Sequence, residues 1–336
     1  MDLRNIYGGK RILVTGATGL IGSSLVRRLL GFTGAEVVVC GRSMGKLQSV
    51  FAGSPSAGTL AFLEHDICRP IPKKVGRFDY IFHAASPISG SVIRSEPVSV
   101  IAANIRGAEN CLECLRTQEN GGSGAGVMVL FSSATVYGEA GSQERICAEE
   151  DTSGGERLSS PTAPYSESKR MVEVLASAYA REFGIGVRTV RFGYVYGSCP
   201  VLPATAFYEF IRKAVAGEDL VFRGSGFGRR DNIHVDDAIN GMLAVCERGE
   251  SAVPYNVSSN GDLGNYAAID EMAEAIAAAA AEHGISCAVK LGGDGERAGG
   301  IRLDNTRAKS LGWSVEVPLA AGVKKVFDFE FRRARK

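Results

Sequence analysis

Short apolar runs alternate with longer amphipathic segments through the first half of the chain. Six runs rich in Val, Ile, Leu and Phe end beside Gly, Ser or Asp, a pattern typical of buried strands. They span residues 11–16, 35–40, 60–66, 80–86, 127–133 and 187–193. Between them, residues 20–31, 97–116 and 165–184 show the apolar spacing of helices. This alternation predicts an α/β fold with a doubly wound parallel sheet.

The pattern loosens in the second half of the chain. Helices are predicted at 204–217, 237–247 and 268–283, with a glycine-rich loop at 223–232 after the first. We therefore expect a main domain over residues 1–193, completed by return segments near 231–258. Residues 194–230 and 259–336 are expected to form a smaller α/β lobe.

The 336-residue chain has an ordinary globular composition, with 45% hydrophobic and 22% charged residues. Its 38 basic and 37 acidic residues leave a formal net charge of +1, which gives no overall field to recruit nucleic acid or an anionic membrane. No apolar stretch reaches the ~18 residues of a membrane helix and no signal-like run opens the chain, so we expect a cytoplasmic protein. The eight cysteines are scattered, without paired CxxC modules or nearby histidines, so no metal site is predicted.

Three glycines spaced three apart, Gly16, Gly19 and Gly22, follow the first predicted strand and open the first predicted helix. This strand-turn-helix setting lets a backbone approach a pyrophosphate and places the phosphates at a helix N-terminus. It predicts that the main domain is a Rossmann-like NAD(P)-binding domain and that the smaller lobe binds substrate. The expected cofactor contacts in this loop are Gly16, Thr18, Gly19, Leu20, Ile21 and Gly22.

The GxxGxxG spacing resembles that of the short-chain dehydrogenase/reductase superfamily, and its extended branch, the NAD-dependent epimerase/dehydratase family, is the closer match. Similar motifs recur in order: Asp66 in EHDI, HAAS at 83–86, Asn104 in NIRGAEN, FSSATVYG at 131–138, YSESK at 165–169, RFGYVYG at 191–197 and RRDNIHVDD at 229–237. The resemblance implies an enzyme acting mostly on nucleotide sugars. The further cofactor contacts that it implies are Asp66 and Ile67 beside the adenine, with Ala84, Ala85, Ser86 and Asn104.

The second predicted strand bears on the identity of the cofactor. NAD-binding folds usually place an acid at the end of this strand, where it holds the 2′-hydroxyl of the adenosine ribose. Here Cys40 stands in that place, and Arg42, about twenty residues beyond the loop, offers a cation where a 2′-phosphate would lie. The sequence therefore favours NADP. NAD is the alternative, with Arg42 stacked on the adenine.

Tyr165 and Lys169 are four residues apart in a predicted helix, so their side chains leave one face. A phenol with a pKa near ~10 is a poor base at neutral pH, but an adjacent ammonium and the positive nicotinamide favour its phenolate. Ser133 ends a predicted strand at the carboxyl edge of the sheet, where ligands bind in open α/β folds. We predict that Ser133, Tyr165 and Lys169 catalyse a reversible hydride transfer, and that Tyr165 and Lys169 also contact the cofactor.

The residues after Ser133 bear on the outcome of the reaction. By the resemblance, relatives that eliminate water typically carry an Asp-Glu pair after the catalytic Thr, and decarboxylating relatives usually carry Thr-Ser-Glu. Ser133-Ala134-Thr135 provides no carboxylate for either task. The pattern resembles a C4 epimerase, in which a 4-keto sugar rotates and takes the hydride back on its other face. An NADP-dependent reductase of a ketosugar or another carbonyl is the alternative, and a dehydratase, a decarboxylase and a non-catalytic dinucleotide-binding regulator are less favoured.

Substrate recognition is assigned mostly by the resemblance. The expected contacts with a nucleoside-diphosphate sugar are Ser133, Thr135, Tyr194, Arg230 and Arg297. Relatives commonly carry Asn at the position of Tyr194. A forked guanidinium suits a diphosphate, and either Arg230 or its neighbour Arg229 would supply it.

Two further expectations concern packing. His234 has apolar neighbours, so a structural role is expected for it, with Asp236 or Asp237 capping the helix that follows. The predicted helices at 97–116 and 165–184 show apolar positions on more than one face, and relatives pair these helices into a four-helix interface. We therefore expect a homodimer.

Overall fold

The computed structural model describes residues 4–54, 58–118, 126–138, 143–152, 154–222, 228–292 and 299–335. Its largest sheet has seven parallel strands in the order β11-β7-β5-β4-β1-β2-β3. These strands are β1 (Arg11–Thr15), β2 (Glu36–Gly41), β3 (Thr59–Glu64), β4 (Tyr80–His83), β5 (Val127–Ser133), β7 (Gly186–Phe192) and β11 (Pro254–Val257). Because all seven run in one direction, their carboxyl ends meet at a single edge of the sheet.

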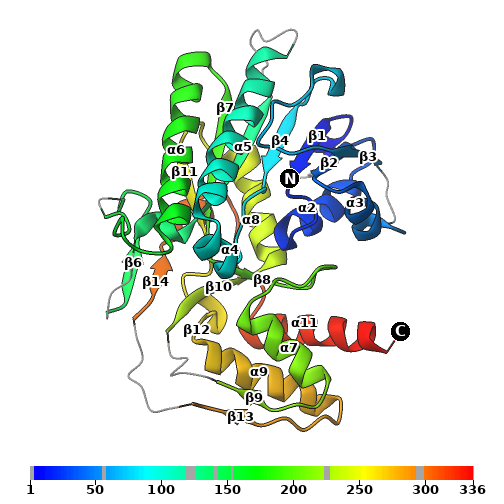
Figure 1. Ribbon diagram of the computed structural model, residues 1–336, viewed down its shortest axis with the longest axis vertical. Helices are drawn as coiled ribbons and strands as arrows, with labels where there is room; N and C mark the ends of the chain where they lie inside the picture. The colour runs from blue at the N-terminus through cyan, green and yellow to red at the C-terminus, as the bar shows by residue number, and fades with distance from the viewer. Residues whose placement is uncertain are drawn as a thin grey trace.

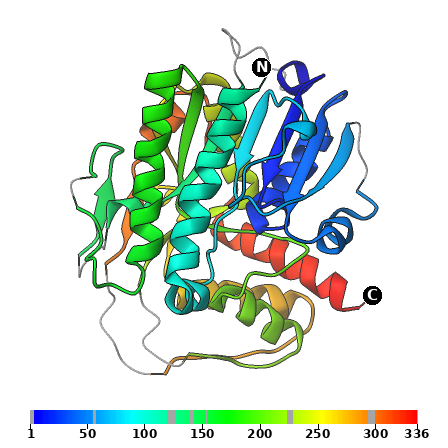
Figure 2. The ribbon, with the colours of Figure 1, turned by 45° about the horizontal axis from the view of Figure 1, so that its top comes forward.

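Helices cover both faces of this sheet (Figure 1, Figure 2). One face carries α5 (Pro97–Thr117) and α6 (Ala163–Phe183), and the other carries α2 (Leu20–Leu30), α3 (Met44–Phe51) and α8 (Val235–Arg248). Alternate residues of β1 serve the two faces: Ile12 and Val14 join the core under α2, whereas Leu13 joins the core under α5 and α6. Two short helices, α1 (Arg4–Tyr7) and α4 (Gly90–Ser95), precede β1 and α5. The predicted doubly wound α/β fold is confirmed.

The second half of the chain adds smaller sheets and a helical layer (Figure 1). A three-stranded sheet has the order β12-β10-β8, and two-stranded pairs join β13 to β9 and β14 to β6. These strands are β6 (Arg145–Cys147), β8 (Tyr194–Tyr196), β9 (Leu220–Val221), β10 (Arg230–His234), β12 (Tyr266–Ala267), β13 (Val289–Lys290) and β14 (Ile301–Leu303). Helices α7 (Ala206–Val215), α9 (Ile269–Glu282) and α11 (Leu319–Ala334) pack on one another, and α10 (Thr306–Lys309) lies beside β11. One apolar core continues from the α2 face of the large sheet into these helices.

The start of α8 differs from its prediction. The helix begins at Val235, and the buried His234 caps it, because its Nδ1 accepts the amide N–H of Asp236 at 3.3 Å. The expectation that Asp236 or Asp237 caps this helix is therefore wrong. The Asp237 carboxylate instead accepts the amide N–H of Val317 at 2.9 Å and ties α8 to the segment before α11.

Candidate active site

The glycine loop joins the end of β1 to the start of α2. Gly16 has a φ of +63°, and a Cβ added there would lie 2.7 Å from the carbonyl carbon of Ala84, the residue after β4. A Cβ on Gly22 would lie 2.4 Å from the carbonyl oxygen of Gly16, so glycine is required at both positions. Gly19 precedes α2 without a capping side chain, and the first turn of α2 holds no acidic residue. The first amides of α2 are thus open to an anion, which fits a dinucleotide pyrophosphate.

The other predicted loop contacts differ in exposure. Thr18 and Ile21 are half-buried, whereas Leu20 is buried in the core under α2. Leu20 therefore anchors the loop through its side chain, and only its backbone is left for a ligand.

The HAAS segment after β4 is held by hydrogen bonds to neighbouring elements. Thr15 Oγ1 accepts the amide N–H of Ala85 at 3.2 Å and bonds Nδ1 of His83 at 2.9 Å. Burial lowers the pKa of His83 to about 3, so the ring is neutral at physiological pH. Ser86 Oγ donates to the buried Asn104 of α5 at 2.7 Å. These hydrogen bonds fix the segment that the sequence predicts to contact the cofactor.

Asn104 also connects this segment to α6. Its side-chain amide donates to Ser168 Oγ at 2.8 Å, and Ser168 Oγ donates to the carbonyl oxygen of Tyr165 at 2.9 Å. With its carbonyl oxygen taken by Ser86, Asn104 is a bridge between the HAAS segment and the helix that carries Tyr165. The structure thus shows that Asn104 links these two segments, a contact that the sequence motif alone does not reveal.

The predicted adenosine end of the site lies where β2 and β3 finish. Cys40 is buried, whereas Arg42 and Asp66 are exposed beside each other. The amide of Cys68, which donates to Asp66 Oδ1 at 3.0 Å, holds the pKa of Asp66 below its ordinary value, with a smaller contribution from the Arg42 charge. Ile67 is buried in the core under α5 and α6. Arg42 and Asp66 can therefore face a ligand, while the Ile67 side chain is occupied by packing.

Ser133, Tyr165 and Lys169 converge at the carboxyl edge of the sheet. Ser133 ends β5, and Tyr165 and Lys169 lie one turn apart in α6. Burial raises the pKa of Tyr165, and its hydrogen bonds with Ser133 and Ser86 lower that pKa in part. The ammonium of Lys169 lies 5.8 Å from the centre of the Tyr165 ring. The three predicted catalytic side chains thus meet at one place.

Lys169 is held in a dry environment. Its side chain is buried, and its Nζ donates to the carbonyl oxygen of Phe131 at 2.7 Å. Burial lowers the pKa of Lys169 to about 8, and the Glu173 carboxylate opposes that shift. The lysine therefore carries its positive charge at neutral pH with a small margin.

A buried network behind Lys169 was not predicted from the sequence. Arg191 of β7 holds Glu173 in a forked pair, with its Nη2 at 2.6 Å from Oε2 and its Nε at 3.0 Å from Oε1. Ser132 donates to the same carboxylate. Arg191 also donates to the Tyr137 hydroxyl at 2.9 Å, and that hydroxyl donates to Asn256 of β11 at 2.6 Å. The helix that carries Lys169 is thereby tied to β5, β7 and β11.

The predicted substrate contacts gather beside Tyr165. Thr135 Oγ1 is buried and has no hydrogen-bond partner among the described residues. Tyr194 is 50% exposed and close enough to Tyr165 to affect its titration. The guanidinium of Arg230 lies 4.7 Å from the centre of the Tyr194 ring. The Tyr194 phenol and the Arg230 guanidinium thus form one exposed surface near Tyr165.

The structure also distinguishes Arg230 from its neighbour. Arg229 Nη2 lies 2.6 Å from a carboxylate oxygen of Glu271, and Arg229 Nη1 donates to the carbonyl oxygen of Tyr266 at 3.0 Å. Arg229 is therefore engaged in the fold, which leaves Arg230 as the better placed of the two for a diphosphate. The remaining predicted contact, Arg297, lies outside the described residues.

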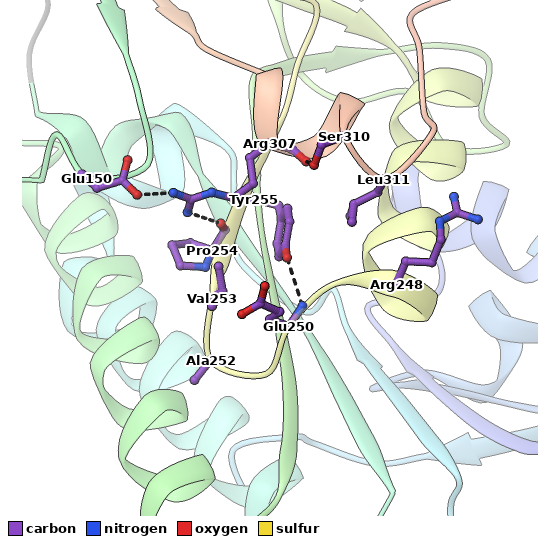
Figure 3. A pocket seen from close by; sticks show the side chains of 10 residues that line it. All are labelled: Glu150, Arg248, Glu250, Ala252, Val253, Pro254, Tyr255, Arg307, Ser310 and Leu311. Carbon is purple, nitrogen blue, oxygen red and sulfur yellow. Dashed lines mark hydrogen bonds and ion pairs between the residues drawn. The ribbon is translucent and has the colours of Figure 1, made fainter.

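One cavity of about 510 Å³ lies away from these side chains, at the amino edge of the sheet where β11 begins (Figure 3). Tyr255 is one of its lining residues, and its hydroxyl accepts the amide N–H of Glu250 at 3.0 Å. The Arg307 guanidinium donates to the carbonyl oxygen of Pro254 at 3.1 Å and to the Glu150 carboxylate. None of the predicted site residues lines this cavity.

Neither a metal-ligand cluster nor a membrane-spanning helix is found in the described ranges of the chain. No group of three or more His, Cys, Asp or Glu side chains there is arranged to hold a metal ion. No helix among the same residues combines the length and the apolar character needed to cross a bilayer.

Comparison with known sequences identifies the family. Residues 12–258 match the NAD dependent epimerase/dehydratase family. The chain is 30% identical over 328 residues to UDP-glucuronic acid decarboxylase 1 of Danio rerio, covering 95% of this chain and 72% of the relative. It is also 30% identical over 258 residues to UDP-glucuronic acid decarboxylase 6 of Arabidopsis thaliana, covering 75% of this chain and 70% of the relative.

Solved structures share the fold. An epimerase of Methanothermobacter thermautotrophicus superposes with a TM-score of 0.81 at 22% identity, covering 100% of this chain and 96% of that one. UDP-glucuronic acid 4-epimerase of Bacillus cereus, solved with UDP-glucuronic acid and NAD, superposes with a TM-score of 0.75 at 24% identity, covering 96% and 99%. The chain therefore belongs to the NAD dependent epimerase/dehydratase family and is an enzyme of the extended short-chain dehydrogenase/reductase type.

Proposed function

We propose that this chain is a nucleotide-sugar 4-epimerase that works through reversible hydride transfer at C4. The observation that carries the proposal is the convergence of Ser133, Tyr165 and Lys169 beside Ala134 and Thr135, a stretch without a carboxylate. These side chains suffice to oxidise a secondary alcohol and to reduce the resulting ketone. Ala134 and Thr135 supply no carboxylate at the positions where dehydrating and decarboxylating relatives carry one.

Each of the three residues has a defined task. Tyr165 removes the proton of the sugar 4-hydroxyl and later returns one to the 4-keto oxygen. The Lys169 ammonium stabilises the phenolate, and the Ser133 hydroxyl hydrogen-bonds the reacting oxygen. The nicotinamide ring, when bound, accepts and returns the hydride. Epimerisation follows when the keto sugar turns and presents its other face before the proton and hydride come back.

Decarboxylation is disfavoured by the residue at position 135. The curated relatives from Danio rerio and Arabidopsis thaliana are named UDP-glucuronic acid decarboxylases. Decarboxylating enzymes of this kind usually carry Glu in the third place of the catalytic segment, where this chain has Thr135. The buried Thr135 hydroxyl without a described partner supports a hydrogen bond to the sugar instead.

The substrate is proposed to be a nucleoside-diphosphate sugar. Arg230 would hold the diphosphate, with Tyr194 against the sugar and Arg297 completing the pocket. We assign substrate binding to residues 194–230 and 259–336, and cofactor binding to residues 1–193 with return segments near 231–258. A homodimer in the cytoplasm is proposed as the working form.

The cofactor is proposed to be NADP, with NAD accepted as well. Cys40 leaves the end of β2 without an acid, and the exposed Arg42 supplies a cation for a 2′-phosphate. The Bacillus cereus epimerase was solved with NAD. An NADP preference also keeps a second function open, the reduction of a ketosugar or another carbonyl, for which Arg42 is the favouring observation.

The test begins with freshly purified protein. Any bound nucleotide is released and identified by mass, and a panel of UDP-, GDP-, CDP- and dTDP-sugars is screened by thermal shift and then for epimer formation. Retained NAD or NADP together with epimer formation from one of these sugars is the expected result. A protein that binds NADPH, ignores every nucleotide sugar and oxidises NADPH with another carbonyl compound would replace the epimerase by the reductase.

A further inference from the structure

The end of β3 places a carboxylate beside the residue thought to select the cofactor. In the parallel pairing of β2 and β3, Glu64 lies opposite Gly41, the last residue of β2. Arg42 is the next residue along the chain. The strand that lacks an acid at its own end therefore has one on the neighbouring strand, at the same edge of the sheet.

The Glu64 side chain points across to α3. Its Oε1 accepts the amide N–H of Met44, the first residue of α3, at 2.9 Å. Ser43, between Arg42 and Met44, accepts the amide N–H of Lys46 at 3.3 Å. One amide at this helix start is thus already paired with an anion supplied by the chain itself.

A 2′-phosphate bound by Arg42 would enter the space beside this carboxylate. Both side chains are exposed, so either can turn toward a ligand. A phosphate needs the Arg42 cation, whereas a ribose 2′-hydroxyl needs an acceptor such as the Glu64 carboxylate. Arg42 and Glu64 therefore favour opposite cofactors at one place.

We propose that Glu64 is a specificity-determining residue for the cofactor: its carboxylate accepts from the ribose 2′-hydroxyl of NAD and opposes the 2′-phosphate that Arg42 attracts. This inference rests on the proposed binding of a nicotinamide dinucleotide. The proposal explains how this chain could bind NAD although β2 ends without an acid. Solved structures of similar fold include an NAD complex. The wild-type preference for NADP is accordingly small, because the two side chains offset each other.

The test uses the full-length protein and measures dissociation constants for NAD⁺ and NADP⁺ by calorimetry at one fixed salt concentration. Glu64→Gln removes the charge and keeps an oxygen that can accept the Met44 amide, so the fold is preserved. Since exposed like charges interact by roughly 1 kcal/mol, NADP⁺ should bind about fivefold more tightly to this variant. NAD⁺ should bind more weakly, because the one oxygen that glutamine keeps is used by the Met44 amide and the acceptor for the 2′-hydroxyl is lost. Arg42→Ala should weaken NADP⁺ binding alone.

The matched control is Glu218→Gln, an exposed glutamate in the segment between α7 and β9. It should leave both constants unchanged. A ratio of NADP⁺ to NAD⁺ affinity that is the same in Glu64→Gln and the wild type would overturn the role of Glu64 while leaving the proposed function intact. A wild-type protein that binds neither dinucleotide would overturn both, and the two failures are therefore distinguishable.

Discussion

The Tyr165 hydroxyl contacts two serines of different origin, Ser133 from β5 and Ser86 from the segment after β4. We predict that Tyr165→Phe lowers turnover by about 10²- to 10⁴-fold, because it removes the only group proposed to move the 4-hydroxyl proton. Cofactor affinity should change little, because the substitution leaves the glycine loop and Lys169, the other cofactor contact predicted in α6, unchanged. Steady-state rates with the identified nucleotide sugar and calorimetric titration with the dinucleotide measure the two effects separately.

The control for that substitution lies on the same helix. Tyr179→Phe removes one hydroxyl, which donates to Glu113 at 2.7 Å far along α6 from the site. Its turnover should stay within about twofold of the wild type. Equal losses in the two variants would assign the effect of Tyr165→Phe to helix stability and not to chemistry.

The pH dependence of turnover should report the charge of Lys169. Burial lowers its pKa to about 8, so the ammonium that stabilises the phenolate is present below that pH and is lost above it. Turnover should therefore fall as the pH rises through about 8. Because the Glu173 carboxylate raises the pKa of Lys169, Glu173→Gln should move the alkaline limb to lower pH.

Initial rates across neutral and alkaline pH measure this limb. Glu182→Gln, at the exposed end of the same helix, is the control and should leave it in place. Because Glu173→Gln also weakens the pair with Arg191, rates are compared at a temperature where thermal unfolding shows both variants folded. A limb that stays at the wild-type position would contradict the assigned role of Lys169 or of Glu173.

At the scale of elements, the two ends of β1 offer a matched pair of glycine substitutions. Gly16 and Gly9 both have positive φ, +63° and +69°, but a Cβ on Gly16 meets the backbone of Ala84 and one on Gly9 meets nothing within 4 Å. Gly9→Ala should cost about 1 kcal/mol of unfolding free energy from the backbone alone. Gly16→Ala should cost more and should also abolish dinucleotide binding.

Chemical denaturation and calorimetric titration of the two variants test this difference. If both lose the same unfolding free energy and both keep the cofactor, the close approach of Gly16 to the end of β4 has no functional consequence. A loss of binding confined to Gly16→Ala would support the loop as the pyrophosphate site.

The elements that the sequence could predict are those with a long hydrophobic pattern. The strands ending in Ser133 and Phe192 are apolar runs bounded by turn residues, and both were found within a residue or two of their observed ends. β11 was missed because its four residues begin with proline and include Asn256, whereas the equally short β4 has the uninterrupted apolar run Tyr80–Phe82. The sheets of the second half are built from strands of two to five residues and were missed for the same reason.

The candidate site follows the same physics. Tyr165 and Lys169 are four apart in one helix, so local geometry brings them together in any helical reading of the sequence. Glu173 and Arg191 meet across two elements, and their pairing depends on how α6 packs on β7, which spacing does not contain. The contact of Glu64 with α3 is of this second kind. Local pairs can thus be predicted from the sequence, and contacts between elements need the fold.

At the scale of the whole molecule, α5 and α6 lie side by side (Figure 2). Val98 and Ile101 on α5 are 78% and 39% exposed, and Met171 and Val174 on α6 are 52% and 64% exposed. On each helix the two residues are three apart, so they share a face. The opposite faces of both helices pack against the sheet in the core, so they do not cover these four side chains. This exposed apolar surface supports the proposed homodimer, in which a second copy of the chain would cover it.

We predict that Val174→Glu converts the dimer into a monomer, because a charge placed on this apolar surface would be buried in the proposed interface without a counterion. Light scattering after size-exclusion chromatography should give twice the chain mass for the wild type and the single mass for the variant. Val221→Glu, at an apolar position 48% exposed on β9, is the control and should stay dimeric. Wild-type protein that elutes as a monomer at every concentration would refute the interface. Tyr165 and Lys169 remain in α6 in the monomeric variant. Its turnover relative to the wild type would therefore measure how much the reaction depends on the interface.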